Sequence, residues 1–186
     1  MVTLIGMGSG SWEALSVQAQ DAVRRAGLVF GAKRLLAGLP PECTARQFAL
    51  YQPAEILETL AQAPGQDAAV LYSGDTGFYS GASGLLTPLR ALGIPARVYP
   101  GVSSIQLLAA ALGRPWQDWK LVSAHGCACD PVAQCMTERS VFFLTGGAET
   151  PATLCRKLTD AGMGEAHGVR SEERRVGKEC RVKGCG

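Results

Sequence analysis

Short apolar runs separated by turns of glycine, serine and aspartate dominate the first hundred residues. Strands are predicted at residues 2–5, 28–30, 68–72 and 96–99, of which 2–5 is expected to be buried and 68–72 is a short apolar strand. A less apolar run at residues 45–50 suits an edge strand. Segments with helical spacing fill the intervals, so the pattern predicts an α/β protein whose first domain is a mostly parallel, doubly wound sheet.

The predicted helices are bounded by residues that start and stop helices. Ser11 is placed to cap a helix over residues 12–26 that Gly27 ends, with an apolar face formed by Ala14, Leu15, Ala22, Val23 and Ala26. Further helices are predicted at residues 32–37, at 53–63 with Pro53 in the first turn, at 79–92, and at 105–112 between Ser103 and Gly113.

A second α/β run follows residues 114–119, RPWQDW, whose proline and two tryptophans are typical of a hinge. Strands are predicted at 120–124 and 141–144, with one helix near 131–136 and another that Thr150 and Pro151 begin and Gly162 ends. This is about half of an ordinary domain of roughly 100 residues. We therefore expect an N-terminal domain at residues 1–113, a hinge at 114–119 and a truncated C-terminal α/β domain at 120–169.

Residues 170–186 are polar and aperiodic, unlike the rest of the chain. Their segment RSEERRVGKEC resembles the translation of a sequencing-library adapter, so we expect an artefactual, disordered tail that packs against nothing and replaces the natural carboxyl end. The tail holds six basic and three acidic residues, and the body holds 12 basic and 13 acidic residues. The positive net charge therefore belongs to the tail; a genuine basic tail is the alternative.

Composition excludes several classes of function. The 186 residues are 47% hydrophobic and 18% charged with a net charge of +2, and no basic stripe runs along the body, which argues against nucleic acid as a partner. The amino terminus, MVTLIGMGSGSW, is typical neither of a signal peptide nor of a membrane span. Seven scattered cysteines suit a reduced, cytoplasmic chain better than a disulfide framework.

Three turns follow predicted strands of the first domain: LIGMGSG at residues 4–10, SGDTGFYSGASG at 73–84 and YPGVSS at 99–104. Ligands of open α/β sheets bind just beyond the carboxyl ends of the strands, and glycine lets backbone approach a ligand closely. The turns therefore predict a small-molecule site built largely of backbone. Each glycine is about equally well explained by a tight turn, and Asp75 by a helix cap.

His125 with Cys127, Cys129 and Cys135 has the residue types of a zinc site. The C-x-C spacing is a poor chelate, however, and no second paired cluster follows, so we expect no metal. His125 is the candidate proton acceptor, because it stands in a predicted loop and an imidazole is the side chain most often used as a general base. The sequence offers no other candidate for a catalytic residue.

Taken in order, GMGSG, SGDTGFYSGASG, YPGVSSIQ, PWQDW, SAHG and FFLTGG resemble the tetrapyrrole (corrin/porphyrin) methylase family over residues 1–168. Within the family, the resemblance is to the branch that methylates a late precorrin at ring carbon C5 in cobalamin biosynthesis. It implies two α/β domains, S-adenosylmethionine in the cleft between them, a homodimer, and a C15-methylating, decarboxylating partner that is either fused or separate.

The resemblance also implies which residues bind the cofactor: Gly8, Ser9, Gly10, Gly74, Asp75, Phe78, Gly101, Ser103, Ser104, Leu144 and Thr145. Two positions depart from the family pattern. Thr76 stands where many relatives have proline, and Cys127 stands where an arginine commonly follows His-Gly, which bears on any contact of that arginine with a substrate carboxylate.

Two alternatives remain. One is another member of the family, acting on uroporphyrinogen or diphthine, and the other is a non-catalytic nucleotide-binding fragment. Because the second domain is expected to be truncated, we expect the 186-residue chain to be weakly active or inactive.

Overall fold

The computed structural model describes residues 1–172 and 175–181, without the side chains of His167, Arg170 and the residues after them. The chain divides into two compact units, with the boundary between Ser104 and Ile105. We had expected the boundary after residue 113. The helix at Ser104–Leu112 (α5) instead belongs almost entirely to the second unit.

The first unit is built on a five-stranded sheet with the order β3-β2-β4-β1-β5. Every pair of neighbouring strands in this sheet is parallel, which confirms the predicted doubly wound sheet. The strands are β1 Val2–Gly6, β2 Leu28–Phe30, β3 Arg46–Phe48, β4 Ala68–Tyr72 and β5 Ala96–Tyr99. The strands β1, β2 and β4 are apolar and buried and form the centre of the sheet. The less apolar β3 lies at one edge as predicted, and β5, which is mostly exposed, lies at the other.

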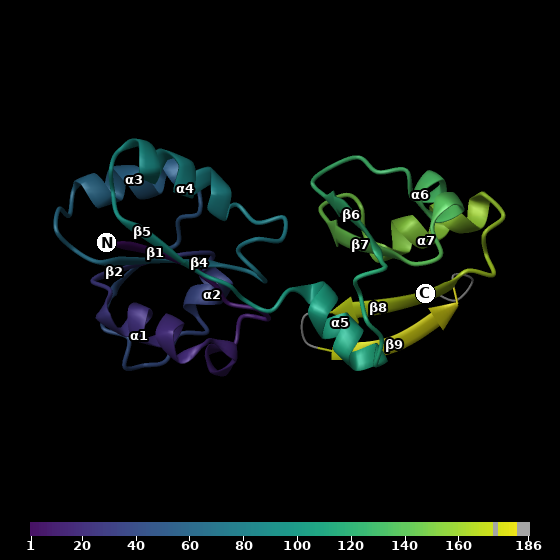
Figure 1. The fold of residues 1–186 in the computed structure, drawn as a ribbon, viewed down its shortest axis with the longest axis horizontal. Coiled ribbons are helices and arrows are strands. Elements are labelled where there is room, and N and C mark those ends of the chain that lie inside the picture. Colours follow the sequence, from purple (N-terminus) through teal and green to yellow (C-terminus); the bar gives the residue numbers. More distant parts are fainter. Residues whose placement is uncertain (173–174, 182–186) are drawn as a thin grey trace. The chain divides into compact units, whose positions relative to one another are not determined.

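Helices cover both faces of this sheet (Figure 1). One face packs on α1 and α2, through residues such as Ile5, Ala69 and Leu71. The other face packs on α3 and α4, through Leu4, Phe30 and Val70, and the Phe30 ring stacks on Phe48 at 5.2 Å. Successive strand residues point to opposite faces, so a fully apolar strand is buried on both sides. The helices are α1 Val17–Arg25, α2 Lys33–Leu36, α3 Pro53–Ala61 and α4 Ala82–Ala91.

The first predicted helix is interrupted, and its predicted cap is wrong. A single 3-10 turn, Trp12–Ala14, precedes α1, and Ser16 is the residue whose hydroxyl accepts from the Ala19 N–H at 3.3 Å. Ser11 makes no capping bond and donates to Glu13 instead. The two serines lie five residues apart, and each precedes a plausible first turn, so the sequence pattern did not distinguish them.

The helix α4 also begins three residues later than predicted. Tyr79 has φ of 47°, in the left-handed region, and this backbone conformation cannot continue into a helix. The Ser80 hydroxyl accepts from the N–H of Ala82, the first residue of α4. The chain between β4 and α4 is consequently a longer loop than expected, and it lies at the carboxyl end of the sheet.

The second unit contains two parallel strands, two helices and a hairpin, besides α5. Its helix α7 has the predicted capping residue, since Thr150 and Thr153 form a reciprocal capping box. The elements are β6 Lys120–His125, α6 Pro131–Thr137, β7 Val141–Gly146, α7 Pro151–Asp160, β8 His167–Glu172 and β9 Arg175–Arg181. In the described part of the chain, no helix has both the length and the apolar character needed to cross a membrane.

The expected disordered tail is not what the structure describes. Strands β8 and β9 pair antiparallel, with a register shift between Arg170 and Ser171. Backbone pairing of this kind satisfies N–H and C=O groups without requiring an apolar side-chain pattern. Whether the tail side chains pack against the rest of the chain lies outside the described residues, and the adapter interpretation stays a prediction.

Candidate functional site

The turns that follow β1, β4 and β5 meet at the carboxyl end of the first sheet. Met7 N–H donates to the Tyr72 carbonyl at 2.8 Å, and Gly8 and Gly74 exchange two backbone hydrogen bonds of 3.1 and 2.8 Å. The first and second turns are therefore held together as a short antiparallel bridge. The second and third turns are joined by side chains: the Gly101 N–H donates to Asp75 Oδ1 at 3.2 Å, and Thr76 Oγ1 donates to the Tyr99 carbonyl at 3.3 Å.

Glycine is required where these turns touch. A Cβ on Gly101 would lie 2.2 Å from the carbonyl oxygen of Gly74 and 2.5 Å from that of Gly6. A Cβ on Gly6 would lie 2.6 Å from the same Gly74 oxygen. All three distances are far below any real carbon–oxygen contact, and the neighbouring oxygens belong to backbone, which cannot move aside. Gly6 and Gly101 thus allow the turns to contact one another. Gly6 stood within the first predicted turn but was not among the predicted site residues.

Gly8 and Gly74 serve a different purpose. Their φ angles are 57° and 64°, in the left-handed region that favours glycine. A Cβ on Gly74 would meet no heavy atom within 4 Å, so the space beside its Cα is open. The backbone of Gly74 is therefore uncovered on this side, and its contact with a ligand stays a prediction.

The other predicted residues of the first unit lie in the same three turns. Ser9 is exposed, Gly10 and Phe78 are half-buried, and Ser103 is buried directly before Ser104, the first residue of α5. The Phe78 ring packs edge-on against Tyr79, with centroids 4.8 Å apart. Asp75 does not cap α4, which was the alternative reading of that residue, because its carboxylate oxygen accepts from Gly101.

Tyr72, the last residue of β4, lies directly before the second turn and beside both the first turn and the loop that leads to α4. Its carbonyl accepts from Met7, and a Cβ on Gly81 would lie 3.7 Å from its ring. Burial raises the pKa of the Tyr72 phenol to about 12 from its ordinary value of 10. The phenol is therefore neutral at physiological pH and cannot accept a proton there.

This shift predicts an alkaline loss of stability. The folded state holds the Tyr72 proton more tightly than the unfolded chain, so its contribution is fully present below pH 10 and is lost as pH rises toward about 12. Between these values, the unfolding free energy of the wild type should fall relative to that of Tyr72→Phe. Denaturant titrations at pH 9 to 12 measure the difference, with Tyr51→Phe, a residue 67% exposed, as the control. Parallel curves for wild type and Tyr72→Phe would contradict the assignment.

In the second unit, the strands β6 and β7 end side by side, with His125 paired to Gly146. The imidazole lies directly over Gly146, where a Cβ would come within 2.0 Å of His125 Cδ2. His125 is the last residue of β6 and is exposed, whereas we had expected it in a loop. Leu144 and Thr145 are half-buried in β7 just before Gly146.

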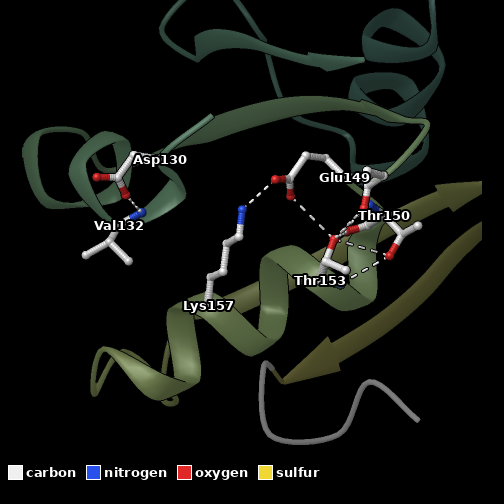
Figure 2. Close-up of polar contacts among 7 residues, drawn as sticks. Asp130, Val132, Glu149, Thr150, Thr153 and Lys157 are labelled. Carbon is white, nitrogen blue, oxygen red and sulfur yellow. Dashed lines mark hydrogen bonds and ion pairs between the residues drawn. The ribbon is translucent and has the colours of Figure 1, made fainter. Parts of the chain in front are cut away.

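The turn after β7 is closed by its own side chains (Figure 2). Glu149 accepts from Lys157 on α7 through one carboxylate oxygen and from Thr153 through the other, while the Thr150 and Thr153 capping bonds start the helix. The same view shows Asp130, which accepts from the Val132 N–H at 3.0 Å at the start of α6. Two charged side chains that line the shallow depression between α6 and α7, about 490 Å³ in volume, thus have partners: Lys157 pairs with Glu149, and Asp130 accepts from the backbone.

Cys129 lines this depression, and Cys135 is close enough for the two thiols to affect each other. Among the described residues, no group of three or more His, Cys, Asp or Glu side chains is arranged to hold a metal ion. Burial raises the pKa of the Cys129 thiol, helped by the negative charge of Glu149, and burial raises the pKa of the Cys135 thiol. Both thiols are therefore held more firmly in the protonated form than an exposed cysteine.

The geometry of the first unit suits recognition of a ligand by backbone. It provides backbone N–H and C=O groups that the hydrogen bonds between the turns hold in place, and open space beside the Gly74 Cα. It also provides the Asp75 carboxylate, which accepts from the Gly101 N–H. It presents no arrangement of nucleophile and base among the described residues of the three turns. Two contributors, Gly6 and Thr76, were missed as parts of the site, since only the fold brings Gly6 onto Gly101 and Thr76 onto Tyr99.

Comparison with known proteins gives relatives that are named as precorrin methyltransferases. The chain is 32% identical over 166 residues to the cobalt-precorrin-7 C(5)-methyltransferase of Salmonella typhimurium, covering 88% of this chain and 80% of that protein. It is 30% identical to the precorrin-6Y C(5,15)-methyltransferase [decarboxylating] of a Sinorhizobium species, covering 89% of this chain and 40% of that protein.

Solved structures share the fold. The precorrin-6Y methylase of Archaeoglobus fulgidus aligns with a TM-score of 0.68 at 19% identity, over 98% of this chain and 90% of that one. The uroporphyrin-III C-methyltransferase of Thermus thermophilus, solved with S-adenosyl homocysteine, aligns with a TM-score of 0.70 at 21% identity, over 98% and 83%. The sequence also matches the Tetrapyrrole (Corrin/Porphyrin) Methylases over residues 1–171. The chain therefore belongs to the tetrapyrrole methylase family and is a methyltransferase of that family.

Proposed function

We propose that this protein transfers a methyl group from S-adenosylmethionine to ring carbon C5 of a late precorrin in cobalamin biosynthesis. The observation that carries the choice of step is the 32% identity over 80% of a relative named as a cobalt-precorrin-7 C(5)-methyltransferase. The proposal concerns the protein with its natural carboxyl-terminal sequence in place of residues 170–186. A cytoplasmic homodimer and a separate or fused C15-methylating partner belong to the same proposal.

The three turns of the first unit are the proposed cofactor site. The residues there that would hold S-adenosylmethionine are Gly8, Ser9, Gly10, Gly74, Asp75, Phe78, Gly101, Ser103 and Ser104, with Leu144 and Thr145 expected from the second unit. Their fit is supported by the open space at Gly74 and by the backbone groups of the turns. A sulfonium methyl donor carries its own leaving group, so the chain needs no metal and no nucleophilic side chain for this reaction.

The residues of the turns would act by position. Turns that are hydrogen-bonded to one another keep their N–H and C=O groups in place, so less entropy is lost when ligand and ring are aligned. The glycines leave no nucleophilic side chain beside the donor. When the new carbon–carbon bond forms and the carbon–sulfur bond breaks, the ring carbon still has to lose a proton.

His125 remains the candidate acceptor of that proton. A His125→Gln variant should then lower kcat by about 100-fold, in the range typical of a lost general base, with little change in KM. The prediction is checked by steady-state kinetics on the protein with its natural carboxyl end. An unchanged kcat would remove His125 from the mechanism and leave the rest of the proposal intact.

The proposal is tested by supplying labelled S-adenosylmethionine with late precorrins, uroporphyrinogen III and a diphthamide-precursor protein. Label on the late precorrin alone is the expected result. Label on uroporphyrinogen or on the protein assigns the chain to another branch of the family. Binding of S-adenosyl homocysteine without transfer to any of them favours a non-catalytic module.

A further inference from the structure

The short helix α2 is fastened to the first of the three turns. A Cβ on Gly38, just after the helix, would lie 2.6 Å from the carbonyl oxygen of Gly10. Leu35, in the middle of α2, is buried, and its Cδ2 would lie 3.6 Å from a Cβ on Gly10. Backbone and apolar contacts therefore fix α2 beside the turn, independently of its charged residues.

The helix α2 positions Arg34 across two of the turns. The Arg34 Nη2 donates a hydrogen bond to Ser73 Oγ, at the end of β4 and next to Gly74. The Arg34 Nη1 would lie 3.9 Å from a Cβ on Gly10, in the first turn. The guanidinium thus reaches from the Gly10 turn to Ser73, although the side chain and Ser73 are both exposed.

The chemistry of this position suits a carboxylate. A guanidinium carries five N–H donors in a planar fork, and this geometry matches the two oxygens of a carboxylate. Both ligands of the proposed function carry such groups: the methionine part of the cofactor has one, and the ring substrate has several. The body of the chain has a net charge of −1, so a carboxylate ligand needs a local cation.

We propose that Arg34 is a carboxylate-binding residue of the site formed by the three turns. The proposal rests on the proposed function for the identity of the ligands. The competing account is structural: Arg34 only ties α2 to the end of β4. That account predicts a change in stability for Arg34 variants without any preference among ligands.

The experiment uses calorimetry to measure the affinities of the 186-residue chain for two pairs of probes. The first pair is S-adenosyl homocysteine and 5′-methylthioadenosine, which lacks the carboxylate. The second pair is a cobalt corrin with seven free carboxylates and its amidated form. The variants are Arg34→Ala, Arg34→Lys and Ser73→Ala. The control is Arg90→Ala, an exposed arginine in the last turn of α4, at the opposite end of the sheet.

Arg34→Ala should weaken a carboxylate-bearing probe by about tenfold or more and leave its carboxylate-free counterpart unchanged, because a charge-assisted bidentate pair is lost. Arg34→Lys keeps the charge without the fork and should recover part of the loss. Loss for S-adenosyl homocysteine but not for methylthioadenosine identifies the cofactor carboxylate. Loss for the acidic corrin but not for its amidated form identifies the substrate.

Two results overturn the proposal. One is an equal loss for the charged and uncharged member of each pair, which indicates a structural role. The other is unchanged affinity for all probes in Arg34→Ala. Failure of the wild-type 186-residue chain to bind S-adenosyl homocysteine is a separate outcome. It contradicts cofactor binding by this chain and with it the role of Arg34, whereas the methyl-transfer proposal concerns the protein with its natural carboxyl end and has its own test.

Discussion

Replacing Gly101 with alanine should abolish binding of S-adenosyl homocysteine and destabilise the first unit. The added methyl group would lie 2.2 Å from the Gly74 carbonyl oxygen and 2.5 Å from the Gly6 carbonyl oxygen. Overpacking of this kind costs typically about 1–3 kcal/mol, occasionally more. Here the neighbours are the backbone of the other two turns, so relief of the clash must separate the turns that form the proposed site. Calorimetric titration and denaturant unfolding measure the two effects.

The matched control is Gly84→Ala. Gly84 lies in α4, and a Cβ there would meet only Pro53 Cγ, at an ordinary 3.8 Å. Alanine is favoured over glycine in a helix by roughly 0.5–1 kcal/mol, so this variant should be as stable as the wild type or more stable, with unchanged binding. If Gly101→Ala does not fold, the second variant is Gly6→Ala, whose Cβ would lie 2.6 Å from the Gly101 nitrogen and 2.6 Å from the Gly74 oxygen. Gly101→Ser is not a useful substitute, because its Cβ meets the same two carbonyl oxygens. Wild-type affinity and stability in Gly101→Ala would contradict the contact between the turns.

Asp75→Ala should weaken ligand binding by about tenfold or more and lower stability. The Gly101 N–H, which is only partly exposed, loses its acceptor at 3.2 Å. Leaving such a donor unsatisfied costs about 1–3 kcal/mol, and the second and third turns lose one of their two side-chain links. Unfolding titrations and calorimetry on the 186-residue chain check both parts of the expectation.

Asp75→Asn separates two roles of the carboxylate. Asparagine keeps an oxygen that can accept from Gly101, so a residue that only links the turns should recover near-wild-type stability and binding. Recovered stability with lost binding would indicate that the charged carboxylate also contacts the ligand. The control is Asp21→Ala, which removes an exposed surface pair with Arg24 and should have little effect. An Asp75→Ala variant with wild-type stability and affinity would refute the link.

The three central strands of the first unit, β1, β2 and β4, were predictable because they are short apolar runs that end in glycine-containing turns. The strands β2 and β4 have the predicted bounds, since residues 28–30 and 68–72 end at Gly31 and at Ser73-Gly74. A strand buried on both faces needs apolar residues at every position, and that requirement is visible without the structure. Local signals were less decisive at helix ends, where Ser11 and Ser16 compete for one cap.

The parts of the site that depend on distant contacts were not predictable. A Cβ on Gly6 or on Gly101 would lie 2.6 Å or less from the backbone of the other because β5 pairs with β1, and no local pattern reveals this pairing. Glycine was interpreted as a mark of close approach to a ligand, whereas at these two positions the approaching atoms are backbone of the chain itself. Arg34 had no signal at all, because an arginine in a four-residue helix resembles an ordinary surface charge.

The position of the methyl group on the product tests the proposed reaction most directly. The protein with its natural carboxyl end should be incubated with S-adenosylmethionine labelled with ¹³C in the methyl group and with a late precorrin, and the product examined by NMR. The account predicts a single enriched methyl carbon bonded to ring carbon C5. Enrichment at another ring carbon, or none on this substrate while uroporphyrinogen is labelled, would contradict it.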